Sequence, residues 1–242
     1  MTRIVTIANP KGGVGKTTVA VNLATVAAYL EKKVILIDLD PNSSSTALLG
    51  AASGMMDSDY NACHALNLYK EGRVVPSELA VPGKHGFDMI LGTYDLPEAE
   101  RFLQQAVGAD THLYECLYDD EKLEKYDLVI IDTGGRIGPV LTTALFAADQ
   151  IIVPSEASDL STVQLTQLID YSEKINAKKK RFLGGASSKI SHVVMTKFRK
   201  GTNASKTNAE NVADLLAKYD ITLANTMIPL AADIENANLK KI

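Results

Sequence analysis

Short apolar segments rich in β-branched residues recur along this chain and alternate with longer segments of helical character. The strand candidates are residues 4–8, 34–37, 87–91, 128–131, 150–153 and 192–195. The segments expected to be helical are residues 16–31, 60–70, 95–107, 111–125, 138–148, 159–177 and 206–219. A strand that is apolar almost throughout is buried on both faces, which is typical of a parallel sheet covered by helices. The pattern therefore predicts a three-layer α/β fold, with a mostly parallel sheet and helices on both of its faces.

The composition is that of a globular protein. Of the 242 residues, 46% are hydrophobic and 22% are charged, which is unlike a disordered chain. No linker rich in Pro, Gly or Ser divides the sequence, and single α/β domains of about 200–250 residues are common. We therefore expect one domain over residues 1–242.

Cysteine usage and apolar segments bear on the compartment. Only Cys63 and Cys116 are present, without a CxxC pair, which disfavours a disulfide framework or a zinc site and favours a reducing compartment. No N-terminal signal region is evident. The longest helix-like apolar stretch, residues 19–30, is shorter than the roughly 20 residues that a membrane span requires. We expect a cytoplasmic protein with no membrane partner.

Residues 9–18, NPKGGVGKTT, lie between the first predicted strand and the first predicted helix. Glycines let backbone N–H groups face an anion, and a helix N-terminus favours negative charge. Lys16 would neutralise the β- and γ-phosphates of a nucleotide, and the Thr17 hydroxyl would ligate Mg²⁺. The strict pattern GxxxxGK(S/T) fails only at Pro10, and a second lysine, Lys11, precedes the glycines. A glycine-rich turn that binds nothing is the alternative to this phosphate-binding loop (P-loop).

The nucleotide-binding residues predicted in the P-loop are Lys11, Gly12, Gly13, Val14, Gly15, Lys16, Thr17 and Thr18.

Residues 11–18, KGGVGKTT, resemble the deviant Walker A box, KGGxGKT(S/T), of the ParA/MinD family of P-loop ATPases. Further segments resemble family motifs, namely VILIDLDP at 34–41, YDLVIIDT at 126–133, ADQIIVP at 148–154, TMIP at 226–229 and IENA at 234–237. Asn42 stands where the family usually has Gln. The resemblance is closest to the short ParA/Soj-type partition ATPases, because no helix-turn-helix domain precedes the first strand. It implies ATP and Mg²⁺ as cofactors and ATP hydrolysis as the activity.

Three carboxylates are expected beside the phosphates. Asp132 ends an apolar strand, where it would hold Mg²⁺ as a Walker B carboxylate does. Asp38 and Asp40, two residues apart, point to the same side if the chain is extended there. In the family, the residue matching Asp40 is implicated in positioning the attacking water, and the one matching Asp38 lies near the metal. Alternatively, either carboxylate only caps the turn at Pro41 and Asn42.

The predicted catalytic residues are therefore Lys11, Lys16, Asp38 and Asp40, and the predicted metal ligands are Thr17, Asp38 and Asp132.

Lys11 is an addition to a P-loop in which Lys16 already neutralises phosphate charge. The resemblance implies that Lys11 reaches the phosphates of a second chain, so that ATP holds a sandwich homodimer and hydrolysis weakens it. Residues 134–138, GGRIG, are expected to move when the γ-phosphate is lost. By family position, the remaining nucleotide contacts are expected at Thr196, Lys197, Phe198 and Pro229.

Charge is divided unevenly along the chain. Residues 1–172 contain 12 Lys and Arg against 23 Asp and Glu, whereas residues 173–242 contain 13 against 6. The net charge of −4 excludes a uniformly basic nucleic-acid coat, but relatives of this type bind DNA without sequence preference as ATP-bound dimers. The residues predicted to contact DNA are Lys178, Lys179, Lys180, Arg181, Arg199 and Lys200. The alternative is a solvated surface without function.

The expected function is DNA partition or segregation, in which the ATPase cycles on and off nucleoid DNA and a ParB-type centromere-binding adaptor stimulates hydrolysis. A ParA-like positioner of a protein cargo and a MinD-like ATPase at the membrane are the alternatives, although residues 236–242 are too short for a membrane-binding helix. A nitrogenase-type iron protein is disfavoured because Cys63 and Cys116 lie in predicted helices. A bacterial tyrosine kinase would need a C-terminal tyrosine cluster, and no tyrosine follows Tyr219.

Overall fold

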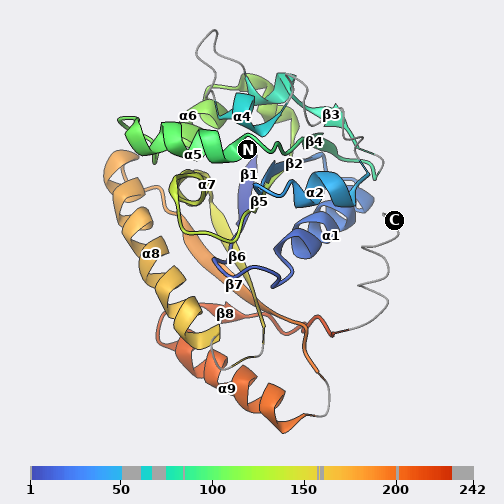
Figure 1. The fold of residues 1–242 in the computed structure, drawn as a ribbon, viewed down its shortest axis with the longest axis vertical. Helices are drawn as coiled ribbons and strands as arrows, with labels where there is room; N and C mark the ends of the chain where they lie inside the picture. The colour runs from blue at the N-terminus through green and yellow to red at the C-terminus, as the bar shows by residue number, and fades with distance from the viewer. Residues whose placement is uncertain are drawn as a thin grey trace.

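The computed structural model describes residues 2–50, 61–66, 75–83, 85–156, 158, 161–199 and 202–230, which form the elements shown in Figure 1. The strands are β1 (Arg3–Ile7), β2 (Val34–Leu39), β3 (Val81–Pro82), β4 (Asp88–Ile90), β5 (Leu128–Thr133), β6 (Gln150–Glu156), β7 (Lys189–Thr196) and β8 (Thr222–Leu223). The helices are α1 (Lys16–Tyr29), α2 (Ser44–Leu48), α4 (Ala62–Ala65), α5 (Leu96–Gln105), α6 (His112–Tyr118), α7 (Pro139–Ala147), α8 (Ser161–Phe182) and α9 (Asn203–Ala217), with 3₁₀ turns η1 (Pro76–Glu78) and η2 (Glu121–Lys125).

One sheet contains all of these strands in the order β3-β4-β2-β5-β1-β6-β7-β8. Within the described ranges, neighbouring strands pair in parallel except β3 and β4, which are antiparallel. Parallel strands run in one direction, so the carboxyl ends of β1, β2, β5, β6 and β7 meet at one edge of the sheet, which we call the carboxyl edge. The predicted mostly parallel sheet is confirmed.

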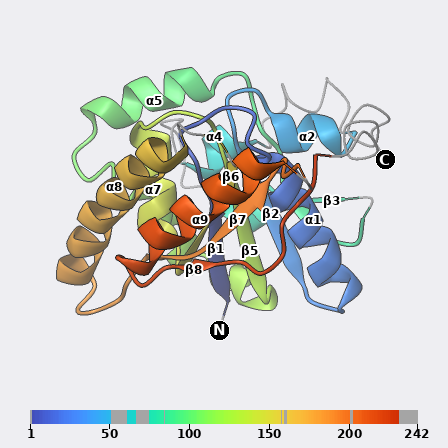
Figure 2. The same ribbon diagram turned by 90° about the horizontal axis from the view of Figure 1, so that it is seen from below.

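Helices cover both faces of the sheet, and both views place α1 and α8 on opposite sides of the strands (Figures 1 and 2). All six residues of strand β2 are buried, because helices pack on both faces of this strand. Ile35 and Ile37 join the apolar cluster that contains residues of α5, α6 and α7, whereas Leu36 joins the cluster that contains residues of α1. The continuous apolar runs of the sequence are therefore explained by burial on both faces, and the three-layer prediction is confirmed.

The end of α8 is anchored by a buried lysine. The helix continues to Phe182, past its predicted end at residue 177, and Lys179 in its last turn is 2% exposed. Lys179 Nζ donates to the carbonyl oxygens of Ala148 at 2.6 Å and Ala147 at 3.4 Å. It also lies 5.7 Å from the ring centroid of Tyr114. A cation is favoured at a helix C-terminus, so Lys179 joins α8 to the end of α7.

The prediction of one helix over residues 111–125 is wrong, because α6 ends at Tyr118 and η2 follows it. The Asp120 carboxylate accepts hydrogen bonds from the backbone N–H groups of Ser77 at 2.6 Å and Lys122 at 3.1 Å. A side chain that binds backbone donors in this way competes with helix continuation. The rest of the helix predicted over 60–70 beyond α4, the motif at 234–237 and Lys200 lie wholly or partly outside the described residues.

We predict that Lys179→Ala lowers the free energy of unfolding by about 2–4 kcal/mol, because it leaves buried carbonyls of α7 without a donor and removes a packed stem. Urea denaturation followed by circular dichroism measures the change. Lys180→Ala is the matched control, since Lys180 occupies the same turn but is exposed, and should change the value by less than about 0.5 kcal/mol. Equal effects of the two substitutions would contradict the role of Lys179.

Candidate nucleotide-binding site

The P-loop follows β1 and is tied to β6 by Asn9. Asn9 Nδ2 donates to the Pro154 carbonyl at 2.7 Å, and Asn9 Oδ1 accepts from the Lys11 backbone N–H at 2.8 Å. Gly13 and Gly15 adopt φ values of 74° and 87°, which only glycine takes up without strain. The sequence motif did not indicate the role of Asn9, which fixes the start of the loop before α1 begins.

Lys16 is the first residue of α1 and is 7% exposed. Its Nζ donates to the Lys11 carbonyl at 3.0 Å, so it lies back over the loop. Burial lowers the pKa of Lys16, while the nearby carboxylates of Asp132 and Asp40 oppose that change. On the other side of the loop, the Thr196 hydroxyl donates to the Val14 carbonyl at 2.8 Å.

Asp132, at the carboxyl edge of β5, is fully buried next to the start of α1. Its Oδ2 accepts a hydrogen bond from the Ser45 hydroxyl at 2.5 Å, whereas Oδ1 is buried with no hydrogen-bond partner among the described residues. Burial and repulsion by Asp38 raise the pKa of Asp132, and the hydrogen bond from Ser45 and the proximity of the Thr17 hydroxyl partly offset the rise. A desolvated carboxylate oxygen next to a threonine hydroxyl is a donor set that suits Mg²⁺, which is commonly held by one or two carboxylates, waters and phosphates.

Asp38 lies beside Asp132 but is engaged differently. Its Oδ2 accepts from the backbone N–H and the hydroxyl of Thr46 at 2.8 Å and 2.7 Å, and its Oδ1 accepts from the Asp40 backbone N–H at 3.1 Å. Burial raises the pKa of Asp38 although the bonds from Thr46 lower it. Both oxygens thus order the turn from β2 into α2, as in the capping alternative, and this geometry gives no support to Asp38 as a metal ligand.

Asp40 closes the same turn and also faces a cavity. Its Oδ1 accepts from the backbone N–H and the side-chain amide of Asn42 at 3.0 Å and 3.1 Å, and its Oδ2 accepts from the Ser44 hydroxyl at 2.7 Å. The turn therefore holds the Asp40 carboxylate in place at the cavity wall. The roles of Ser44, Ser45 and Thr46 were not predicted from the sequence, although the hydroxyl-rich run after Pro41 is typical of such a turn.

The cavity has a volume of about 680 Å³ and runs from the P-loop to the segment after β8. The residues that line it are Gly12, Gly13, Gly15, Lys16, Thr17, Thr18, Asp40, Asn42, Ser44, Ala47, Leu48, Gly135, Thr196, Lys197, Ile228, Pro229 and Leu230. Phe198, predicted to contact nucleotide, does not line the cavity. Its backbone instead accepts from Leu230 N–H at 3.1 Å and donates to the Ile228 carbonyl at 3.0 Å, which holds the far end of the cavity in place.

The two glycines after β5 lie against the P-loop and against the turn after β2. A Cβ atom at Gly135 would lie 3.3 Å from the Gly12 Cα, and one at Gly134 would lie 2.7 Å from the Pro41 Cδ. No larger residue fits at Gly134 without a shift of the turn after β2. The segment predicted to move with nucleotide state is thus in contact with both loops that border the cavity.

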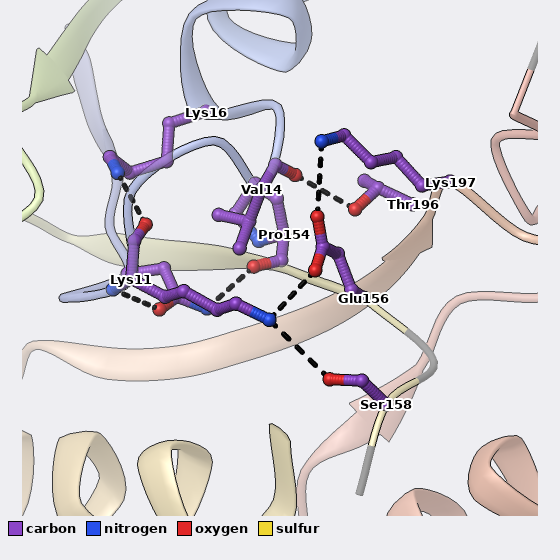
Figure 3. Close-up of polar contacts among 9 residues, drawn as sticks. Lys11, Val14, Lys16, Pro154, Glu156, Ser158, Thr196 and Lys197 are labelled. Carbon is purple, nitrogen blue, oxygen red and sulfur yellow. Dashed lines mark hydrogen bonds and ion pairs between the residues drawn. The ribbon is translucent and has the colours of Figure 1, made fainter. Parts of the chain in front are cut away.

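Lys11 and Lys197 both bind one carboxylate that sequence analysis missed. Lys11 Nζ lies 2.7 Å from Glu156 Oε2, and Lys197 Nζ lies 3.1 Å from Glu156 Oε1 (Figure 3). Glu156 is the last residue of β6, at the carboxyl edge. The available signal was an acidic residue just after the motif at 148–154, where the strand reaches the site.

The predicted DNA-contacting residues fall into separate groups. Lys178, Lys180 and Arg181 are exposed in the last turns of α8, and Lys178 forms an ion pair with Asp110. Lys179 in α8 is buried against the end of α7, so its prediction as a DNA contact is wrong for this fold. Arg199 is exposed beyond the other end of β7, a strand of eight residues that spans about 25 Å at about 3.3 Å per residue.

The buried carboxyls make the stability of the nucleotide-free chain depend on pH. The pKa of Asp132 is raised above its ordinary value. Between these two pKa values the folded chain retains a proton that the unfolded chain has released, so the stability of the fold decreases as the pH rises from the ordinary to the raised pKa. We predict that Asp132→Asn raises the Tm by several degrees at pH 8, where each kcal/mol corresponds to about 2–4 °C. At pH 5 the gain should be much smaller, because the native carboxyl is then largely protonated.

Differential scanning calorimetry of the two proteins without nucleotide or Mg²⁺ measures both values. A gain in Tm that is the same at pH 5 and pH 8 would show that Asp132 does not titrate in the folded chain.

Comparisons with known proteins agree with this geometry. A family described as an AAA domain matches residues 2–184. The chain is 36% identical over 175 residues to the chromosome-partitioning ATPase Soj of Thermus thermophilus, a match that covers 72% of this chain and 63% of that protein. It is 30% identical over 236 residues to the chromosome partitioning protein ParA of Caulobacter vibrioides, covering 97% of this chain and 83% of that protein.

The fold is also similar to that of a solved structure, cobyrinic acid a,c-diamide synthase from Mycobacterium smegmatis with bound ADP and magnesium. The TM-score is 0.81 at 25% sequence identity, and the match covers 100% of this chain and 93% of that one. The chain spans less than two thirds of the Soj relative's length. In the described part of the chain, no helix combines the length and apolar character needed to cross a bilayer. The P-loop with its second lysine, the parallel sheet and these matches establish that the chain belongs to the ParA/MinD family of P-loop ATPases.

Proposed function

We propose that this protein is a ParA-type partition ATPase that binds and hydrolyses Mg²⁺–ATP at the carboxyl edge of its sheet. One observation carries the proposal: Lys16, Thr17 and Asp132 lie together at the N-terminus of α1, next to a cavity of about 680 Å³, and Asp132 Oδ1 has no hydrogen-bond partner in the described part of the chain. The partition role is supported by the similarity to Soj and ParA proteins. We further propose that residues 1–242 act as one ATPase domain, since one sheet joins β1 to β8.

Each residue of the site has a proposed role. Lys16 and the P-loop N–H groups neutralise and orient the phosphates, and Thr17 and Asp132 hold the metal. Bound Mg²⁺ supplies the positive charge that offsets the charge on the transferred phosphoryl group. Asp40 positions the attacking water, and Asp38 acts on Asp40 by fixing the turn that carries it.

The opposite end of the cavity is where we place the base and sugar. Pro229 lines that end, Thr196 and Phe198 act through the backbone segments that they hold, and Lys197 lines the cavity with its ammonium group near Gly13.

We infer that ATP brings two chains together as a sandwich homodimer in which each Lys11 reaches the partner's nucleotide. This dimer would bind double-stranded DNA without sequence preference and cycle on and off the nucleoid in the cytoplasm. A ParB-type adaptor would stimulate hydrolysis and so release the protein from plasmid or chromosomal DNA. The second lysine of the P-loop and the exposed basic residues Lys178, Lys180, Arg181 and Arg199 support this cycle.

The first test concerns the nucleotide itself. Lys16→Ala is expected to weaken Mg²⁺–ATP binding by about ten- to a hundredfold, because charge-assisted hydrogen bonds to phosphate are removed, and calorimetric titration measures the affinity. Asp40→Asn is the matched variant, which should bind ATP normally and hydrolyse it at least about tenfold more slowly. Undiminished ATP affinity in Lys16→Ala would refute the P-loop assignment.

The second test concerns DNA. Binding of the ATP-loaded chain to a DNA duplex should weaken with salt, by about 0.9 logarithmic units per logarithmic unit of salt for each phosphate that the protein neutralises. The double substitution Lys180→Ala/Arg181→Ala and the single substitution Arg199→Ala should each reduce that slope, by about one unit for every phosphate that is no longer neutralised. Fluorescence anisotropy at several salt concentrations measures it.

Lys32→Ala serves as the control, since it removes an exposed lysine from the acidic part of the chain. If the salt slope of Lys180→Ala/Arg181→Ala or of Arg199→Ala equals that of Lys32→Ala, the substituted residues belong only to a solvated surface.

A further inference from the structure

Glu156 forms ion pairs with two lysines, Lys11 in the P-loop and Lys197 directly after β7 (Figure 3). Lys11 Nζ donates to Glu156 Oε2 at 2.7 Å and lies 3.4 Å from the Ser158 hydroxyl. Lys197 Nζ binds the other carboxylate oxygen at 3.1 Å and lies above the loop, 3.9 Å from where a Cβ of Gly13 would be. Burial raises the pKa of Glu156, but the two lysines outweigh it and the net shift is downward, so the carboxylate is charged.

The backbone of Lys11 is held independently of its side chain. Asn9 Oδ1 accepts from the Lys11 N–H at 2.8 Å, and Lys16 Nζ donates to the Lys11 carbonyl at 3.0 Å. Glu156 and Ser158 are therefore the contacts that set where the ammonium group of Lys11 lies in this structure. Moving that group requires rotation of the side chain only, with no change in the P-loop.

The side chain of Lys11 does not line the nucleotide cavity of its own chain. Among the described residues, the cavity lining includes Lys197 but neither Lys11 nor Glu156. The Lys11 and Glu156 side chains are 25% and 21% exposed, so the pair lies at the surface of the carboxyl edge. The charge of a cation held there is partly neutralised by Glu156, which weakens its attraction for another anion.

We propose that Glu156 is a positioning residue that holds Lys11 within its own chain and competes with the partner's nucleotide for it. This inference rests on the proposed ATP-dependent dimer and adds to it a carboxylate that accepts Lys11 within the same chain. Formation of the dimer would transfer the Lys11 ammonium from a carboxylate to a phosphate. The strength of the Glu156 pair would then set how readily the ATP-bound chain dimerises.

The test is Glu156→Gln, which keeps the shape of the side chain and removes its charge. With Mg²⁺ and a non-hydrolysable ATP analogue at saturation, sedimentation velocity should give a dimer dissociation constant about two- to fivefold lower than that of the wild type, the range expected for a partly exposed ion pair. An unchanged or higher dissociation constant overturns the proposal.

Glu156→Gln also frees Lys197, so the measurement is repeated in a Lys197→Ala background. If Glu156→Gln still lowers the dimer dissociation constant in that background, the effect is assigned to Lys11. If it no longer does, the effect is assigned to Lys197 and the proposal is overturned. Lys11→Ala separates this inference from the proposed function. If Lys11→Ala still forms a normal dimer, the cross-interface role of Lys11 is refuted. If Lys11→Ala does not dimerise but Glu156→Gln has the dimer dissociation constant of the wild type, only the competition by Glu156 is overturned.

A spectroscopic reading on the nucleotide-free chain tests the pair directly. In ¹⁵N spectra of the lysine ammonium groups, Glu156→Gln should shift the Lys11 signal, which is assigned by its absence in Lys11→Arg. An unshifted signal would show that Lys11 is not held by Glu156 in solution. Thermal unfolding of Glu156→Gln confirms that the variant is folded, as expected for a partly exposed residue at a strand end.

Discussion

Parallel pairing of β1 with β5 and β6 is the constraint on which the site depends. It brings the residues that follow five strands to the carboxyl edge and sets their heights relative to one another. In the register of the sheet, Asp38 lies opposite Asp132, and Glu156 lies opposite Thr196. The buried carboxyls and the residues that hold the P-loop are neighbours because of this register, although they are far apart in the sequence. A shift by one residue would turn each side chain to the other face of the sheet.

Concentrating charge at a buried edge has an energetic consequence for the free chain. Asp38 and Asp132 are desolvated, which raises the pKa of both, and repulsion by Asp38 adds to the rise at Asp132. Hydroxyl groups of α2, on Ser45 and Thr46, offset part of this but leave Asp132 Oδ1 without a partner among the described residues. A divalent cation and phosphates at this site would complete the charge balance. The carboxyls destabilise the empty state and favour a cation.

Much of the fold and the P-loop could be predicted from the sequence, because both depend on local patterns. Continuous apolar runs indicated strands buried on two faces, and the glycine and lysine spacing located the loop between β1 and α1. Tertiary contacts decided what the sequence could not. Lys179 belongs to a basic run, yet it lies in helical phase with the buried residues Leu168, Ser172 and Ile175, and its ammonium binds the end of α7. That spacing was the signal that distinguishes it from Lys180.

Two kinds of residue escaped prediction for different reasons. Asn9 and Glu156 form contacts between the P-loop and β6, and their partners could not be known without the strand order. Glu156 is also the residue that gives Lys11 a position in the free chain. In the proposed cycle, Lys11 therefore has two alternative anions, one within its own chain and one on a partner's nucleotide.

The most direct test of this exchange is a crystal structure of the chain with Mg²⁺ and a non-hydrolysable ATP analogue. The predicted result is a dimer across the carboxyl edge, in which Thr17 and Asp132 flank the metal and Lys11 Nζ has left Glu156 for a phosphate bound to the second chain. A dimer in which Lys11 remains on Glu156, or one formed through another surface, would contradict it.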